Sequence, residues 1–103
     1  PILPTLDELI GVNGVDESNV ASHLLSLTAS EPRRDHVYTL HAEMEGNRLA
    51  PVFELLLEGW RAQGYALCAT RDYADTLDVA ALPQHAVHHR EIPGRSGTLA
   101  LQI

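Results

Sequence analysis

The fold is decided by residues 36–46, HVYTLHAEMEG, where an apolar run turns polar and acidic before it ends at a glycine. Residues 37–40 are β-branched, aromatic or aliphatic, which is typical of a strand covered on both faces. Period-two alternation then places His41 and Glu43 on the same side of this strand. Ligands bind beyond the carboxyl ends of strands in helix-flanked parallel sheets, so we expect the chemistry at His41 and Glu43.

The composition limits the size of the protein and its partners. The chain has 103 residues, which suits one ordinary domain, and 14 acidic side chains against 7 basic ones give a net charge of −7. This charge disfavours phosphate backbones, so we expect no nucleic-acid partner. The single cysteine excludes an internal disulfide and fits a reducing compartment, and no apolar run is long enough for a membrane span. A cytoplasmic location follows as an expectation.

Apolar periodicity and turn residues predict the other elements. We expect the last residues of a strand at 1–5, a helical turn at 6–10, a turn at 11–14 and a helix at 17–29. Further along we expect a helix from Pro51 that stops at Gly64, a strand at 65–69 with Cys68 as an inert core thiol, and a brief helix after Thr70. Residues 86–92 and 97–103 are expected to form a terminal hairpin or a pair of edge strands. This order of strands and helices predicts α/β units on a parallel sheet.

Such a sheet is incomplete in this chain. Right-handed crossovers that step in one direction cover only one face of a three-stranded sheet, yet residues 37–40 are too apolar to face water. We therefore expect an α/β sheet or barrel that is closed by chain before Pro1 or by a second subunit. Because the sequence starts with Pro1 and not Met, we further expect residues 1–103 to be a single segment of a longer polypeptide.

Histidines supply two candidate sites. His41 is either a general acid or base, since an imidazole titrates near neutrality, or a partly buried histidine bonded to a carbonyl, and its position weighs both evenly. His85, His88 and His89 offer metal-binding groups, but only a helix would bring His85 and His89 to one face. Solvated histidines on an edge strand are therefore favoured.

Two motifs carry a resemblance to a known family. Residues 1–11, PILPTLDELIG, and 37–46, VYTLHAEMEG, in this order and spacing, resemble the C-terminal third of polysaccharide deacetylases of the NodB-homology type. The most similar branch deformylates 4-deoxy-4-formamido-arabinose on undecaprenyl phosphate. The resemblance implies the C-terminal portion of a distorted (β/α) barrel with a short terminal hairpin.

The resemblance also implies a mechanism. In this family a divalent metal such as zinc, held by one Asp and two His, activates water against an N-acyl carbonyl, and a late-strand histidine protonates the departing amine. His41 matches that histidine, and Thr5, Glu43 and Glu45 are expected to bind substrate or support the site. The metal ligands, and the aspartate that acts as general base in this family, belong to motifs before Pro1, so residues 1–103 are expected to bind no metal and to be inactive alone.

The expected activity is hydrolysis of an N-formyl or N-acetyl group from an amino sugar, carried on a glycolipid, during modification of lipid A in the bacterial envelope. Peripheral contact with the inner membrane face would accompany such a substrate. The alternative is a non-catalytic α/β interaction module that uses an open sheet face for a partner.

Overall fold

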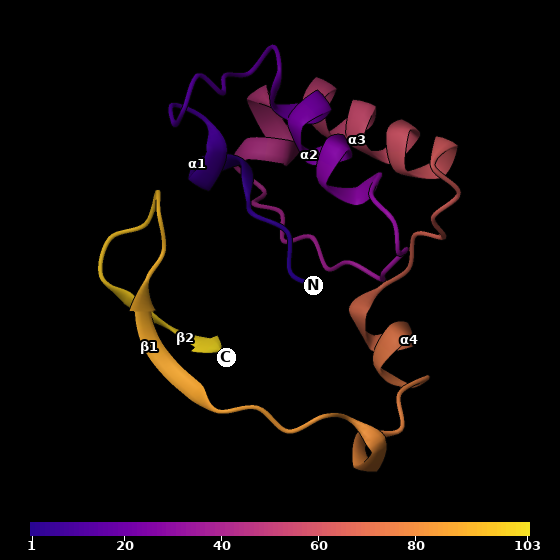
Figure 1. Ribbon diagram of the computed structural model, residues 1–103. Helices are drawn as coiled ribbons and strands as arrows, with labels where there is room; N and C mark the ends of the chain where they lie inside the picture. The colour runs from indigo at the N-terminus through magenta and orange to yellow at the C-terminus, as the bar shows by residue number, and fades with distance from the viewer. The chain divides into compact units, whose positions relative to one another are not determined.

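The computed structural model describes all residues from Pro1 to Ile103 and divides them into two compact units, Pro1–Leu67 and Cys68–Ile103. The elements follow one another as Figure 1 traces them along the chain: α1 (Leu6–Leu9), α2 (Val20–Thr28), a π-helical turn (Met44–Arg48), α3 (Ala50–Ala62), α4 (Thr70–Ala74), a 3-10 turn (Val79–Ala81), β1 (Val87–Glu91) and β2 (Thr98–Gln102). No helix combines the length and the apolar character that crossing a bilayer requires.

Helix α1 forms where the sequence predicts a helical turn. The carboxylate of Glu8 accepts a hydrogen bond of 2.9 Å from the backbone N–H of Thr5, which satisfies an amide at the helix start. The predicted turn after α1 is confirmed, since Gly11, Asn13 and Gly14 all adopt positive φ. The helix ends at Leu9 because Ile10 is extended, and the left-handed residues that follow reverse the chain.

Helix α2 begins later than the predicted residue 17. Asp16 caps a separate turn, because its carboxylate accepts hydrogen bonds from the backbone N–H of Ser18 at 2.8 Å and from the Ser18 hydroxyl at 2.5 Å. These bonds hold the pKa of Asp16 below its ordinary value. The helix itself buries Val20 and Leu24, as its apolar stripe predicts.

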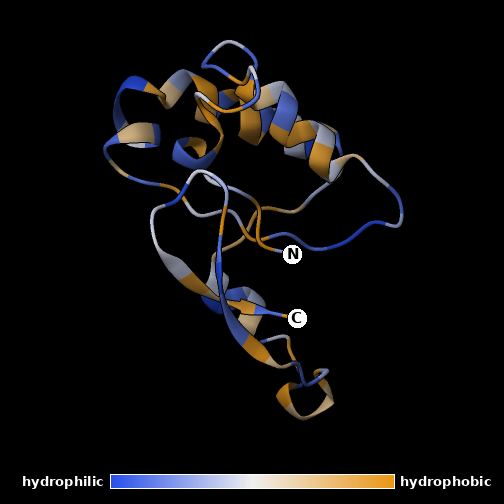
Figure 2. Cartoon of the chain, turned by 60° about the vertical axis from the view of Figure 1, so that its left-hand side comes forward, coloured by the Kyte–Doolittle hydropathy of each residue, from blue (hydrophilic) through white to orange (hydrophobic).

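Helices α2 and α3 enclose the core of the first unit, and apolar and polar residues alternate around them (Figure 2). Gly59 allows a close approach, since a Cβ there would lie 2.5 Å from a methyl carbon of Leu25. Gly64, with φ of +88°, ends the helical stretch as predicted. The buried apolar side chains are Leu3, Leu6, Val20, Ala21, Leu24, Leu49, Val52, Leu56 and Trp60.

The three-stranded parallel sheet that the sequence predicts does not form. Within residues 36–40 only Val37 pairs, through a parallel bridge to Ile2. Val37 and Leu40 are 37% and 48% exposed, so the prediction of a strand covered on both faces is wrong. Residues 65–69 also form no strand, and Cys68 is exposed and not a core thiol. An apolar run becomes a strand only where a neighbour completes its hydrogen bonds, and these runs have none beyond the bridge.

The second unit contains the predicted hairpin. Strands β1 and β2 pair antiparallel, with Val87 opposite Gln102 and Glu91 opposite Thr98. None of the residues from Cys68 to Ile103 is buried. The α/β class is thus confirmed, with a two-stranded antiparallel sheet as the only sheet, while the distorted barrel stays a prediction.

Candidate active site

His41 lies where the extended residues 36–40 meet the π-helical turn. Its carbonyl accepts hydrogen bonds of 3.0 Å from the backbone N–H groups of both Met44 and Glu45. The chain therefore bends at Ala42 and Glu43, which form a turn in place of a continued strand. The predicted alternation that pairs His41 with Glu43 is wrong for this reason, and Glu43 is exposed.

The carboxylate near the His41 ring comes from α1. Nδ1 of His41 lies 3.7 Å from Oδ1 of Asp7, and the two side chains are 31% and 44% exposed. Nδ1 has no hydrogen-bond partner at this separation, but an ion pair forms when the ring is protonated. The Thr5 hydroxyl donates a hydrogen bond of 2.5 Å to the same Asp7 oxygen. Thr5, Asp7 and His41 therefore form a connected group of side chains.

Sequence reasoning missed Asp7 as a site residue. Asp7 and Glu8 are adjacent acidic residues in the first turn of α1, and Glu8 caps the start of this helix. The available signal is the position of Asp7 in the first turn after Thr5, within the motif at residues 1–11. Sequence periodicity does not show which segments meet in space. It therefore cannot predict that this motif lies next to His41.

Glu45 is a buried carboxylate beside His41, with 2% of its surface exposed. Its oxygens accept hydrogen bonds from the Tyr38 hydroxyl at 2.6 Å and from the backbone N–H of His41 at 2.9 Å. Burial, followed by the bond to Glu45, raises the pKa of Tyr38 well above its ordinary value. Of the predicted site residues, Thr5 and Glu45 therefore gather around His41, and Glu43 does not.

The C-terminal histidines do not gather. His85, His88 and His89 are all exposed, and Nδ1 of His85 lies 3.1 Å from the carbonyl oxygen of Ile103. No group of three or more His, Cys, Asp or Glu side chains in this chain is placed to hold a metal ion. The residues present thus do not fit the metal that the resemblance implies.

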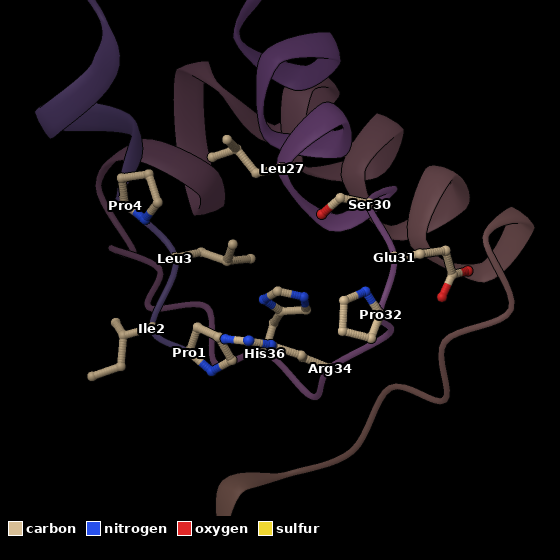
Figure 3. A pocket seen from close by; sticks show the side chains of 10 residues that line it. All are labelled: Pro1, Ile2, Leu3, Pro4, Leu27, Ser30, Glu31, Pro32, Arg34 and His36. Atoms are coloured by element: carbon tan, nitrogen blue, oxygen red, sulfur yellow. The ribbon is translucent and has the colours of Figure 1, made fainter.

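A pocket of about 360 Å³ is lined by His36 and not by His41 (Figure 3). Nδ1 of His36 is buried without a hydrogen-bond partner, and burial lowers the pKa of this ring. The lining residues come from 1–4, from Leu27, and from Ser30, Glu31, Pro32, Arg34 and His36. This open pocket is distinct from the group formed by Thr5, Asp7 and His41.

Comparison with known proteins shows which proteins this chain resembles. Two curated proteins that match this chain are named as probable sugar deformylases, a group within the NodB-type polysaccharide deacetylases, which confirms the predicted resemblance. One is a probable 4-deoxy-4-formamido-L-arabinose-phosphoundecaprenol deformylase, ArnD, of Shewanella sediminis, with 34% identity over 97% of this chain and 32% of the relative. The protein of the same name in Wigglesworthia glossinidia brevipalpis shows 31% identity over 97% of this chain and 34% of its own length.

The chain spans about a third of the length of these two relatives. No family model matches it. No solved structure matches it either. Similarity to the deformylases over nearly the whole chain is therefore the comparison that bears on function.

Proposed function

We propose that this chain supplies the general acid of a hydrolytic site that removes an N-formyl or N-acetyl group from an amino sugar. The two relatives are named for deformylation of 4-deoxy-4-formamido-L-arabinose on phosphoundecaprenol. A lipid-linked formamido sugar is accordingly the substrate that we propose. The observation that carries the proposal is the pairing of His41 with Asp7 at 3.7 Å.

The chemistry requires a proton donor. When an amide is hydrolysed, the C–N bond breaks readily only if the nitrogen leaves as a neutral amine, so a nearby acid must deliver a proton to it. An imidazolium is suited to this task because its proton is exchanged near neutral pH. His41 is partly exposed, which leaves its ring accessible to a substrate.

We assign different tasks to the two ring nitrogens of His41. Nδ1 faces Asp7, whose carboxylate would balance the positive charge of the protonated ring and orient it. Nε2 is then the nitrogen that delivers the proton to the leaving amine. Thr5 supports this step indirectly, because its hydroxyl holds the Asp7 oxygen that faces Nδ1.

Activation of the attacking water is assigned to residues outside 1–103. The resemblance implies a divalent metal for that task, and this chain has no cluster of ligands for one. The relatives are about three times as long as the matched region, so they have room for a metal-binding part of the same domain. Another subunit could supply the metal site instead. A lipid carrier on the substrate would bring such an enzyme to the inner membrane face.

The proposal is tested with a chimera in which residues 1–103 replace the matched third of the Shewanella sediminis relative. We expect the chimera to release formate from a formamido-arabinose phospholipid, and the 103-residue chain alone to release none. Thermal melting monitored by circular dichroism verifies that the chimera is folded. A folded chimera without activity, beside an active parent relative, would contradict the proposal.

A further inference from the structure

Glu45 is an acidic side chain in an unusual environment. It is 2% exposed, and it takes no part in the ion pairs of His41 with Asp7 and of Arg48 with Glu17. A buried carboxylate is unfavourable unless hydrogen bonds replace the water that it loses. Both oxygens of Glu45 are bonded, one to Tyr38 and the other to the main chain of His41. These two hydrogen bonds therefore compensate for the burial of Glu45.

Glu45 and His41 are joined by two reciprocal hydrogen bonds. The backbone N–H of His41 donates to Oε2 of Glu45 at 2.9 Å, and the backbone N–H of Glu45 donates to the carbonyl of His41 at 3.0 Å. Both main-chain polar groups of His41 are thus held by one residue. These two hydrogen bonds close a short loop around the His41 main chain and restrain its position.

Tyr38 connects the loop to the core. Its hydroxyl donates to Oε1 of Glu45 at 2.6 Å, and its ring packs against Trp60 with the ring centroids 5.2 Å apart. Trp60 is 6% exposed and belongs to the core side of α3. The position of the His41 main chain is therefore fixed, through Glu45 and Tyr38, relative to a packed helix.

We infer that Glu45 is a positioning residue that fixes the His41 main chain for proton transfer, with Tyr38 as its anchor to the core. This inference rests on the proposed function of His41. It narrows the expectation that Glu45 binds substrate or supports the site to the supporting role, because both carboxylate oxygens are occupied and the side chain is buried. A general acid that is displaced by about 1 Å can lose roughly 100-fold in rate, so control of its position matters.

The first test measures position without activity. We compare Glu45→Ala, Glu45→Gln and Tyr38→Phe with Glu54→Gln, a matched carboxylate-to-amide change at an exposed site on α3. Hydrogen exchange of the His41 amide, followed by NMR in the 103-residue chain, should accelerate by about 10-fold or more in Glu45→Ala. Glu45→Gln, which keeps an acceptor, should restore part of the protection, and Glu54→Gln should change nothing.

The second test uses the chimera. Glu45→Ala should lower kcat by roughly 10- to 100-fold with KM almost unchanged, and Glu45→Gln should recover part of the loss. Tyr38→Phe, which keeps the ring on Trp60, provides a milder variant if Glu45→Ala does not fold. A raised KM with normal kcat would make Glu45 a substrate-binding residue and overturn the inference.

The two tests separate this inference from the proposed function. Unchanged exchange of the His41 amide in Glu45→Ala overturns the positioning role, whether or not the chimera is active. Accelerated exchange together with an inactive, folded chimera contradicts the proposed function and leaves the local role of Glu45 supported.

Discussion

The carboxylate of Asp7 and the imidazole of His41 face each other across 3.7 Å, one from the first turn of α1 and the other from the end of the extended residues 36–40. The Thr5 hydroxyl holds the Asp7 oxygen that faces the ring. Asp7 is therefore constrained on its own side, and it is placed to act on His41 electrostatically and by orientation.

Replacing Asp7 by Asn tests this pair. The amide keeps the size of the side chain but removes the negative charge, so in the chimera we expect kcat to fall by about 10-fold or more with little change in KM. Steady-state kinetics of formate release measure both constants. Asp72→Asn is the matched control, since Asp72 also lies in the first turn of a short helix but forms no ion pair. Equal kcat values for the two variants would exclude a role for Asp7 in the reaction.

The contact between Gly59 and Leu25 predicts that the effect of Gly59→Ala on the free energy of unfolding changes sign when Leu25 is shortened. A methyl group at Gly59 would meet the Leu25 side chain at 2.5 Å, and such overpacking costs about 1–3 kcal/mol. Alanine is favoured over glycine in a helix by roughly 1 kcal/mol. We expect Gly59→Ala to lower the free energy of unfolding in the native sequence and to raise it in a Leu25→Ala background. Thermal melting of the four proteins measures the cycle, and the same effect in both backgrounds would refute the contact.

Tyr38 should make the free energy of unfolding depend on pH in the alkaline range. Its pKa is raised in the folded state, so above the ordinary value of about 10 the folded chain retains a proton that the unfolded chain releases. The folded state binds more protons there, and the free energy of unfolding falls as the pH rises. Urea unfolding at about pH 8 and about pH 11 should show this loss, and Tyr38→Phe should reduce it. An identical loss in Tyr38→Phe would assign the effect to other groups.

Two adjacent leucines of α3 test the position of the core. Leu56 is fully buried, whereas Leu55 is 55% exposed. Leu56→Ala should lower the free energy of unfolding by about 2–5 kcal/mol, because it removes buried methyl groups and leaves a cavity. Leu55→Ala should change it by less than about 0.5 kcal/mol. Denaturant titration of both variants decides, and comparable losses would place the core elsewhere.

Local sequence signals predict the helices and the hairpin well. Proline in the first turn of α3, the glycine at position 64 and the apolar stripe of α2 are each explained by neighbouring residues. The segments 36–40 and 65–69 are different, because a strand depends on a partner that its own residues do not specify. Their apolar character predicts that they prefer burial, but it does not determine what pairs with them.

The candidate site was predictable in part for the same reason. The resemblance of residues 37–46 identifies His41, and Glu45 follows from the same motif. Sequence reasoning misses Asp7 because the contact of Asp7 with His41 depends on the pairing of residues 1–3 with Val37, which is distant in sequence. The prediction for Glu43 is wrong because the hydrogen bonds to the His41 carbonyl start a turn. The period-two alternation therefore ends before it reaches Glu43.

The central claim is that His41 donates the proton to the leaving amine. The most direct measurement is kcat for formate release by the chimera with and without His41→Ala, together with its metal content. We expect kcat to fall by roughly 100-fold or more while the metal content stays the same. An unchanged kcat in a folded, metal-loaded His41→Ala chimera would contradict the account.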